Sequence, residues 1–222
     1  MSENKNGFVE FFSNDMLMTI TMVVAVLSSV VQSWMNLLIL SLFSSFTYFV
    51  NAVCIVVVYV SYKKHDKNVM KGMMGAIFML MLLRQAESFT SYLGNIAQPK
   101  IFSLAAMALL FILILILMVN HFIINADRHS KPWNVKFNQI IFICLLILEV
   151  VYRMALIINS ESKFLRLSYL VSIVTVVATL CILICIETKL EGYKAYREAN
   201  GWVETPYSGE AKETNSEEQV NG

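Results

Sequence analysis

Residues 16–62 read MLMTITMVVAVLSSVVQSWMNLLILSLFSSFTYFVNAVCIVVVYVSY and contain no Asp, Glu, Lys, Arg or His. The polar sequence KKHDK follows at once, at residues 63–67. As a single helix rising about 1.5 Å per residue, this stretch would be about 70 Å long, more than twice the ~30 Å hydrocarbon core of a bilayer. The stretch is therefore expected to cross a membrane, turn and cross back.

The composition of the whole chain also indicates a membrane protein. Of the 222 residues, 57% are hydrophobic and 15% are charged, whereas soluble domains carry about 25% charged residues. The net charge is only +1 and no aromatic-basic pattern occurs, which argues against nucleic-acid binding. The four cysteines lie in apolar segments and are read as small packing residues.

Six segments are long and apolar enough to cross a bilayer, which takes about 20 residues each. They are 16–35, 37–60, 72–93, 101–124, 138–158 and 165–186. We expect an all-α integral membrane protein, with a six-helix transmembrane bundle over residues 16–186. An N-terminal segment at 1–15 and a tail at 187–222 flank it. The first turn is expected near residues 32–36, the most polar group in the long apolar stretch.

Basic residues in the connecting segments predict the orientation in the membrane. Segment 63–71 carries four lysines, and segment 125–137 carries one arginine and two lysines. The alternate connections carry only Lys100 and Lys163, with Arg166 at the edge of a predicted helix. The positive-inside rule then places both termini in the cytoplasm. The expected location is a plasma or inner membrane, which the chain crosses several times. The acidic tail is expected to begin as a helix and to end disordered.

Two of the predicted helices carry charged residues near their middle. Arg84 and Glu87 are three residues apart and Glu149 and Arg153 are four apart, so each pair shares one helix face. One charge near the bilayer centre costs about 2.5–3.5 kcal/mol on insertion scales, so all four are expected to face inward and pair. The predicted polar core consists of Arg84, Gln85, Glu87, Glu149, Tyr152 and Arg153.

Two pairing schemes satisfy these charges. In one, Arg84 meets Glu149 and Glu87 meets Arg153 across the helices, because these residues lie at matched depths from the predicted inner helix ends. In the other, each pair neutralises itself within its own helix. The polar core then either lines a path for a proton, ion or solute, switches between two packings, or locks the helices in register.

Further polar residues are candidates for lining a cavity. They are Ser44, Tyr48 and Asn51 in the second predicted helix and Asn120 and His121 in the fourth. Hydrogen bonds between helices, worth about 0.6 kcal/mol each in a membrane, are the alternative explanation.

No metal or cofactor site is predicted. His121, Asp127 and His129 supply nitrogen and oxygen ligand types, but their spacing specifies no metal. Neither Gly-x-Ser-x-Gly nor His-Glu-x-x-His occurs, and no predicted helix contains a lysine for a Schiff base. An enzyme would need a group such as His121 within hydrogen-bonding reach of a carboxylate.

The function expected from these features is that of a membrane-embedded regulatory, sensory or accessory protein. A small-solute transporter or ion-conducting channel that uses the same polar core is the alternative, and an enzyme comes last. The expected partners are the lipid bilayer, a protein bound at the cytoplasmic loops and tail, and a second copy of the chain.

Overall fold

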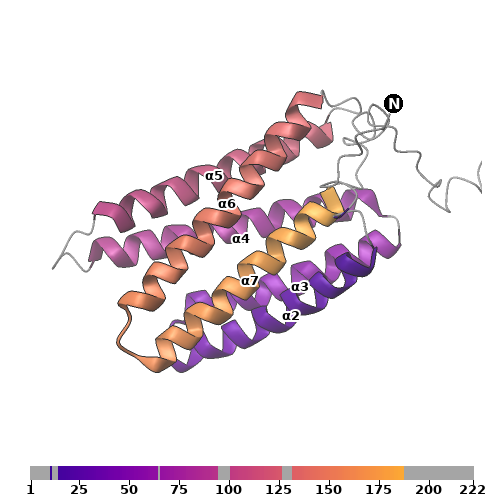
Figure 1. The fold of residues 1–222 in the computed structure, drawn as a ribbon. Coiled ribbons are helices and arrows are strands. Elements are labelled where there is room, and N and C mark those ends of the chain that lie inside the picture. The colour runs from indigo at the N-terminus through magenta and orange to yellow at the C-terminus, as the bar shows by residue number, and fades with distance from the viewer. Residues whose placement is uncertain (1–10, 12–14, 65, 95–100, 127–131, 188–222) are drawn as a thin grey trace, which may run out of the picture.

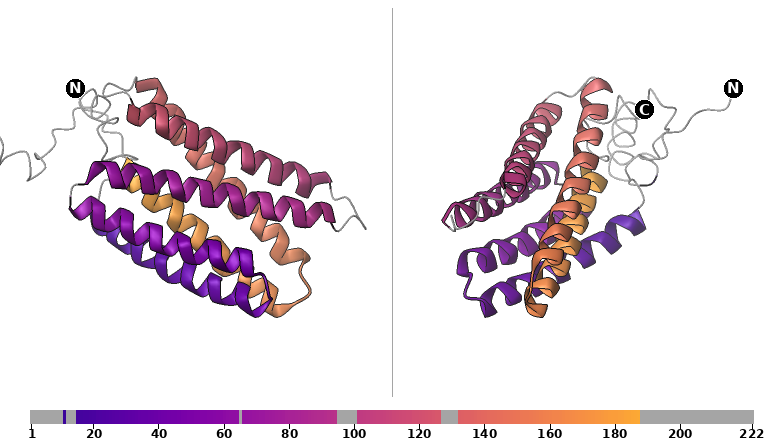
Figure 2. Two further views of the ribbon diagram at one scale, coloured as in Figure 1. Left: turned by 180° about the vertical axis from the view of Figure 1, so that it is seen from behind. Right: turned by 60° about the vertical axis from the view of Figure 1, so that its left-hand side comes forward.

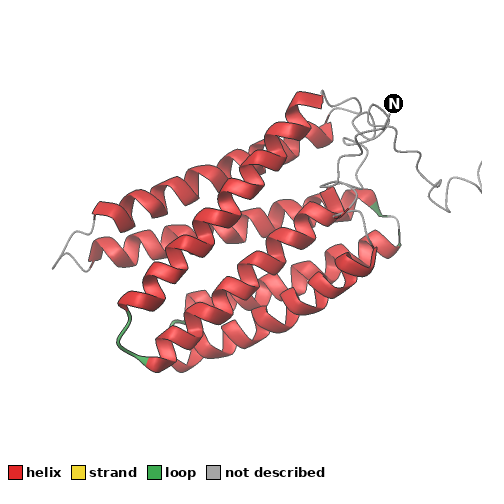
Figure 3. Ribbon diagram, in the orientation of Figure 1, coloured by secondary structure: helices red, strands yellow, loops and turns green. Residues whose placement is uncertain are grey.

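The computed structural model describes residues 11, 15–64, 66–94, 101–126 and 132–187. Within these ranges the chain is all helical and has no strand, as Figures 1 and 3 show. The helices are α2 (Asp15–Leu38), α3 (Leu42–Lys63), α4 (Lys67–Gly94), α5 (Ile101–Ala126), α6 (Pro132–Asn159) and α7 (Lys163–Glu187). All six are long and apolar enough to cross a membrane, so the described part of the chain has the predicted six helices.

Some predicted features lie outside the described residues. Most of the N-terminal segment and all of the tail beyond Glu187 fall on residues 1–10, 12–14 and 188–222. Asp127 and His129 also lie outside the described residues.

The six helices form a ring. Each helix packs against the next one along the chain, and α7 closes the ring by packing against α2. Successive helices run in opposite directions, so the start of α2 and the end of α7 lie at the same end of the bundle (Figures 1 and 2). We call this the Glu187 end, and the opposite end, where α2 turns into α3, the Leu40 end.

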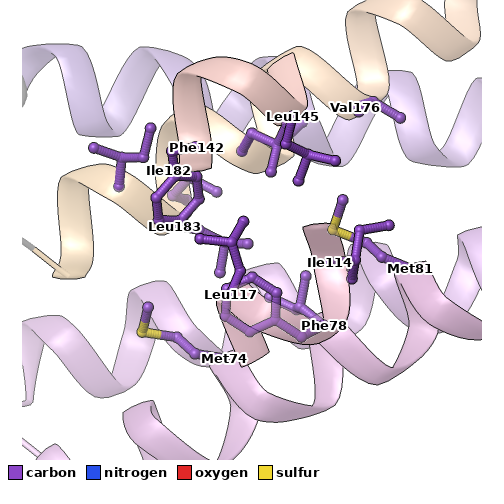
Figure 4. Close-up of a cluster of buried hydrophobic side chains, with 14 of the residues drawn as sticks. Met74, Phe78, Met81, Ile114, Leu117, Phe142, Leu145, Val176, Ile182 and Leu183 are labelled. Atoms are coloured by element: carbon purple, nitrogen blue, oxygen red, sulfur yellow. The ribbon is translucent and has the colours of Figure 1, made fainter. Parts of the chain in front are cut away.

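An apolar core fills the space between α4, α5, α6 and α7. Phe78, Leu117, Phe142 and Leu183 meet there, each no more than 2% exposed (Figure 4). Because lipid is as apolar as these side chains, they hold the helices together by close packing rather than by escape from water.

The outer faces of the helices carry large apolar side chains. Leu27, Phe46 and Ile147 are examples, at 61%, 65% and 55% exposed. Such a surface fits contact with lipid, in which the backbone polar groups must be paired inside each helix.

Helices α4, α6 and α7 begin earlier than their apolar windows, and polar side chains cap α4 and α7. Asp66 Oδ1 accepts a hydrogen bond from the Val69 amide (3.1 Å), and Ser162 Oγ accepts one from the Leu165 amide (3.4 Å). Such side chains replace the missing partners of the first helical amides. Helix α6 begins at Pro132, whose fixed φ suits the first helical position.

The turn between α2 and α3 lies beyond the predicted position at residues 32–36. The Ser41 amide donates to Asn36 O (2.9 Å) and the Leu40 amide donates to Leu37 O (3.0 Å). Leu40 has a φ of 60°, in the left-handed region that usually takes glycine at a helix end. The turn therefore lies at residues 39–41.

Gln32 and Asn36 belong to α2 because their side chains form a buried contact. Gln32 Nε2 donates to Asn36 Oδ1 (3.3 Å) within the helix and to Ser168 Oγ of α7 (3.0 Å). The polarity that predicted a turn at this point marks a helix-helix contact instead.

Candidate functional site

Glu149, on α6, lies at the centre of a buried group of polar side chains. It is only 2% exposed. Its Oε1 accepts a hydrogen bond from Gln85 Nε2 of α4 (2.8 Å), and its Oε2 accepts one from Arg153 Nε (2.9 Å). The carboxylate therefore forms an ion pair one turn along its own helix and a hydrogen bond to the neighbouring α4.

Arg153 extends these contacts to two more helices. Its Nη1 donates to Ser172 Oγ of α7, and this oxygen lies 3.1 Å from the Tyr48 hydroxyl of α3. Ser172 and Tyr48 are 2% and 6% exposed. The chain of contacts from Gln85 to Tyr48 thus joins α4, α6, α7 and α3.

Arg84, on α4, has no carboxylate partner among the described residues. It is 9% exposed, and its Cζ lies 4.4 Å from the centroid of the Tyr48 ring, a cation-π contact. Its Nη1 is buried and has no hydrogen-bond partner. Among the described residues Arg84 forms no ion pair, because Glu149 binds Arg153.

Glu87 lies one turn further along α4 and faces α3. Its two carboxylate oxygens accept hydrogen bonds from the hydroxyls of Ser41 (3.4 Å) and Ser44 (2.5 Å). Of the two pairing schemes, the structure has the local pair on α6, and neither scheme describes Arg84 and Glu87. These two side chains diverge toward different parts of α3.

We define the polar network as the residues joined by these contacts. They are Tyr48, Arg84, Gln85, Glu149, Arg153 and Ser172. The network closes on itself because Arg84 and Gln85 are consecutive in the chain. Its two arginines and one glutamate sum to one positive charge, since +2 and −1 give +1. Tyr152 is also buried, at 9% exposed, beside Arg153 on α6.

A row of hydroxyls on α7 faces α2 and α3. Asn51, a predicted cavity residue, donates to Ser29 Oγ of α2 (3.1 Å) and to Thr179 Oγ1 of α7 (3.4 Å). Together with Gln32 and Ser168, these residues join the three helices along one interface. In the structure Asn51 therefore takes part in helix-helix hydrogen bonds.

A second polar group lies at the Glu187 end. His121 Nδ1 lies 3.3 Å from Glu187 Oε1, Asn138 Nδ2 donates to Glu187 Oε2 (2.8 Å), and Asn120 Nδ2 donates to Asn138 Oδ1 (3.0 Å). His121 Nε2 lies 3.4 Å from the Lys71 carbonyl oxygen. We call His121, Asn138 and Glu187, each 1% exposed, together with Asn120 the end cluster.

The end cluster joins residues that the sequence analysis treated separately. Glu187 was expected to begin the tail, but it is the last residue of α7 and is buried. Asn120 and His121, the cavity candidates of the fourth predicted helix, contact Asn138 and Glu187. Within the described residues, no three His, Cys, Asp or Glu side chains gather in a way that could hold a metal ion.

Sequence reasoning did not include Ser172 among the site residues. The available signal was the spacing of Ser168, Ser172, Thr175 and Thr179, at intervals of four, three and four residues, which puts all four on one helix face. All four are buried, at no more than 4% exposed. In an apolar helix such a row indicates the face that packs against other helices.

Comparisons of the chain with protein-family models, with curated proteins and with solved structures give no match. The description of this protein therefore rests on its own fold and site. In the part of the chain that is described, six membrane-length helices form a ring around a buried polar network.

Proposed function

We propose that this protein is a multi-pass regulatory, sensory or accessory protein of a plasma or inner membrane, and that the polar network is its two-state element. The observation that supports this proposal is the chain of contacts from Gln85 through Glu149, Arg153 and Ser172 to Tyr48. A change at any one of these groups acts on four helices at once.

The two proposed states differ in which arginine pairs with Glu149. Glu149 binds Arg153, while the buried Arg84 is adjacent in sequence to Gln85, which donates a hydrogen bond to Glu149. Transfer of the carboxylate from Arg153 to Arg84 exchanges one ion pair for another and moves α4 relative to α6. Two packings with similar ion pairs are the requirement for a switch.

A pair of spin labels tests this two-state proposal. Thr90 on α4 and Ile158 on α6 are exposed at the Leu40 end, and both are replaced by cysteine after removal of the native cysteines. Glu149→Gln is expected to shift or broaden the label-to-label distance distribution measured by pulsed electron resonance. The matched control Glu161→Gln changes an exposed glutamate and leaves the distribution as it is. An unchanged distribution in Glu149→Gln contradicts the proposal.

The proposed orientation puts the Glu187 end in the cytoplasm. Lys63 and Lys64 are exposed there, and the positive-inside rule supports this side. The loops at this end, with the tail, are the proposed binding surface for a protein partner. In sealed right-side-out membranes, cysteines placed at positions 64 and 128 should resist an impermeant label, and labelling from outside refutes the orientation.

A second candidate function is transport of a small solute or an ion. Arg84 favours it, because a buried positive charge without an ion pair suits an anion in transit. Flux through the purified protein in liposomes separates the two functions. Flux that Glu149→Gln abolishes and Glu161→Gln retains supports transport, and an absence of flux supports the regulatory proposal.

An enzymatic function has the least support. His121 does lie next to a carboxylate, that of Glu187, as an enzyme requires. However, both side chains are 1% exposed, and Asn138 binds the second oxygen of Glu187. The geometry fits a structural contact between helix ends.

A further inference from the structure

We infer that Arg84 is the binding residue for a small monovalent carboxylate that enters the polar network. This inference rests on the proposed function, because it names the class of ligand to which the network responds. It is carried by the contacts of Arg84, by those of its counterpart Arg153, and by the charge of the network.

The burial of Arg84 is the first observation. The side chain is 9% exposed, and its Nη1 is both buried and without a hydrogen-bond partner. Guanidinium groups do not lose their proton in proteins, so the group is charged here. A buried charge in a protein is normally paired with an opposite charge. Because Glu149 is paired with Arg153, a ligand is the remaining source of a negative charge for Arg84.

Arg153 shows which ligand chemistry suits this environment. It meets a carboxylate oxygen at 2.9 Å, and it has the guanidinium group that Arg84 also has. The planar donors of guanidinium match the two oxygens of a carboxylate. A ligand carboxylate therefore forms with Arg84 the kind of ion pair that Glu149 forms with Arg153.

The charge of the network sets the valence of the ligand. Arg84, Arg153 and Glu149 together carry one positive charge, and Glu87 is bound to the hydroxyls of Ser41 and Ser44 at its own site. One negative charge makes the buried network neutral, whereas a dianion leaves an excess charge. Tyr48 covers one face of the Arg84 guanidinium, so the ligand approaches the edge of that plane, where the N–H groups point.

Binding of radiolabelled acetate to the purified full-length protein in lipid nanodiscs tests the inference. We expect saturable binding that unlabelled acetate displaces and that equal concentrations of chloride or sulfate do not. Arg84→Met should weaken acetate binding on the order of tenfold or more, because a charge-assisted hydrogen bond is lost. The matched control is Arg166→Met, since Arg166 is an exposed arginine outside the network.

Arg84→Lys covers the case in which Arg84→Met does not fold. It keeps the charge but loses the planar donor edge, and it should also bind acetate more weakly than the wild type. The inference is overturned by a lack of saturable binding to the wild type, by equal acetate binding in either Arg84 variant, or by displacement with chloride as effective as with acetate.

The failures of the two proposals are separable. If acetate binds through Arg84 and Glu149→Gln leaves the spin-label distances unchanged, the two-state function is wrong and the ligand site stands. If the distances respond to Glu149→Gln and acetate does not bind, the ligand site is wrong and the two-state function stands.

Discussion

The guanidinium of Arg84 lies over the ring of Tyr48, with 4.4 Å between the arginine Cζ and the ring centroid. The Tyr48 hydroxyl contacts Ser172, which in turn accepts a hydrogen bond from Arg153. Tyr48 thus links the arginine without an ion pair to the arginine that has one.

Two substitutions of Tyr48 separate its two roles. Tyr48→Phe keeps the ring beneath Arg84 and removes the hydroxyl, so it should lower the free energy of unfolding by about 0.5–1.5 kcal/mol, the net worth of one hydrogen bond. Tyr48→Leu also removes the cation-π contact, worth about 2 kcal/mol at a desolvated site. Unfolding of each variant in mixed detergent micelles measures the difference. Equal stability of the two variants would show that the ring does not hold Arg84.

The end cluster predicts a local effect at the last turn of α7. Glu187→Ala removes the acceptor that His121 and Asn138 share, and the buried donor left unpaired should cost about 1–3 kcal/mol. Glu187→Gln keeps one carbonyl oxygen and should cost less. Hydrogen exchange should rise in residues 180–187 of Glu187→Ala. Glu161→Ala, at an exposed position, is the control, and protection equal to the wild type in Glu187→Ala argues against the cluster.

The turn at Leu40 predicts a substitution that does not destabilise the protein. A left-handed conformation costs a non-glycine residue about 1–2 kcal/mol, and the greater freedom of glycine in the unfolded chain offsets about 0.4–1 kcal/mol of the gain. Leu40 is 85% exposed, so few contacts are lost. Leu40→Gly should therefore equal or exceed the wild type and exceed Leu40→Ala by up to about 1.6 kcal/mol in unfolding free energy. A glycine variant less stable than the alanine variant would contradict this reading of the turn.

The sequence was sufficient to predict the six helices because each apolar window is long enough to cross a bilayer. It was not sufficient for their ends. Gln32 and Asn36 resemble a turn when read alone, and only the position of Ser168 on α7 shows that they belong to a helix interface. Glu187 resembles the start of a polar tail for the same reason, because its partners lie on α5 and α6.

Helical spacing also predicted which residues share a face, but not which partner each one selects. Glu149 and Arg153 meet at the expected interval of four residues. Arg84 and Glu87 also share a face, yet Arg84 contacts a tyrosine ring on α3, and Glu87 contacts one serine hydroxyl on α3 and one in the turn before it. These choices depend on the rotation of α3 against α4, which the sequence pattern leaves open.

Two double-mutant cycles test the central claim that Glu149 belongs to Arg153 and leaves Arg84 without an ion pair. Each of the three residues is changed to methionine, alone and in the pairs Glu149 with Arg153 and Glu149 with Arg84, and the free energy of unfolding is measured in mixed micelles. We predict a coupling of about 1–3 kcal/mol for Glu149 with Arg153 and a smaller coupling for Glu149 with Arg84. A larger coupling for Glu149 with Arg84 than for Glu149 with Arg153 would contradict the account.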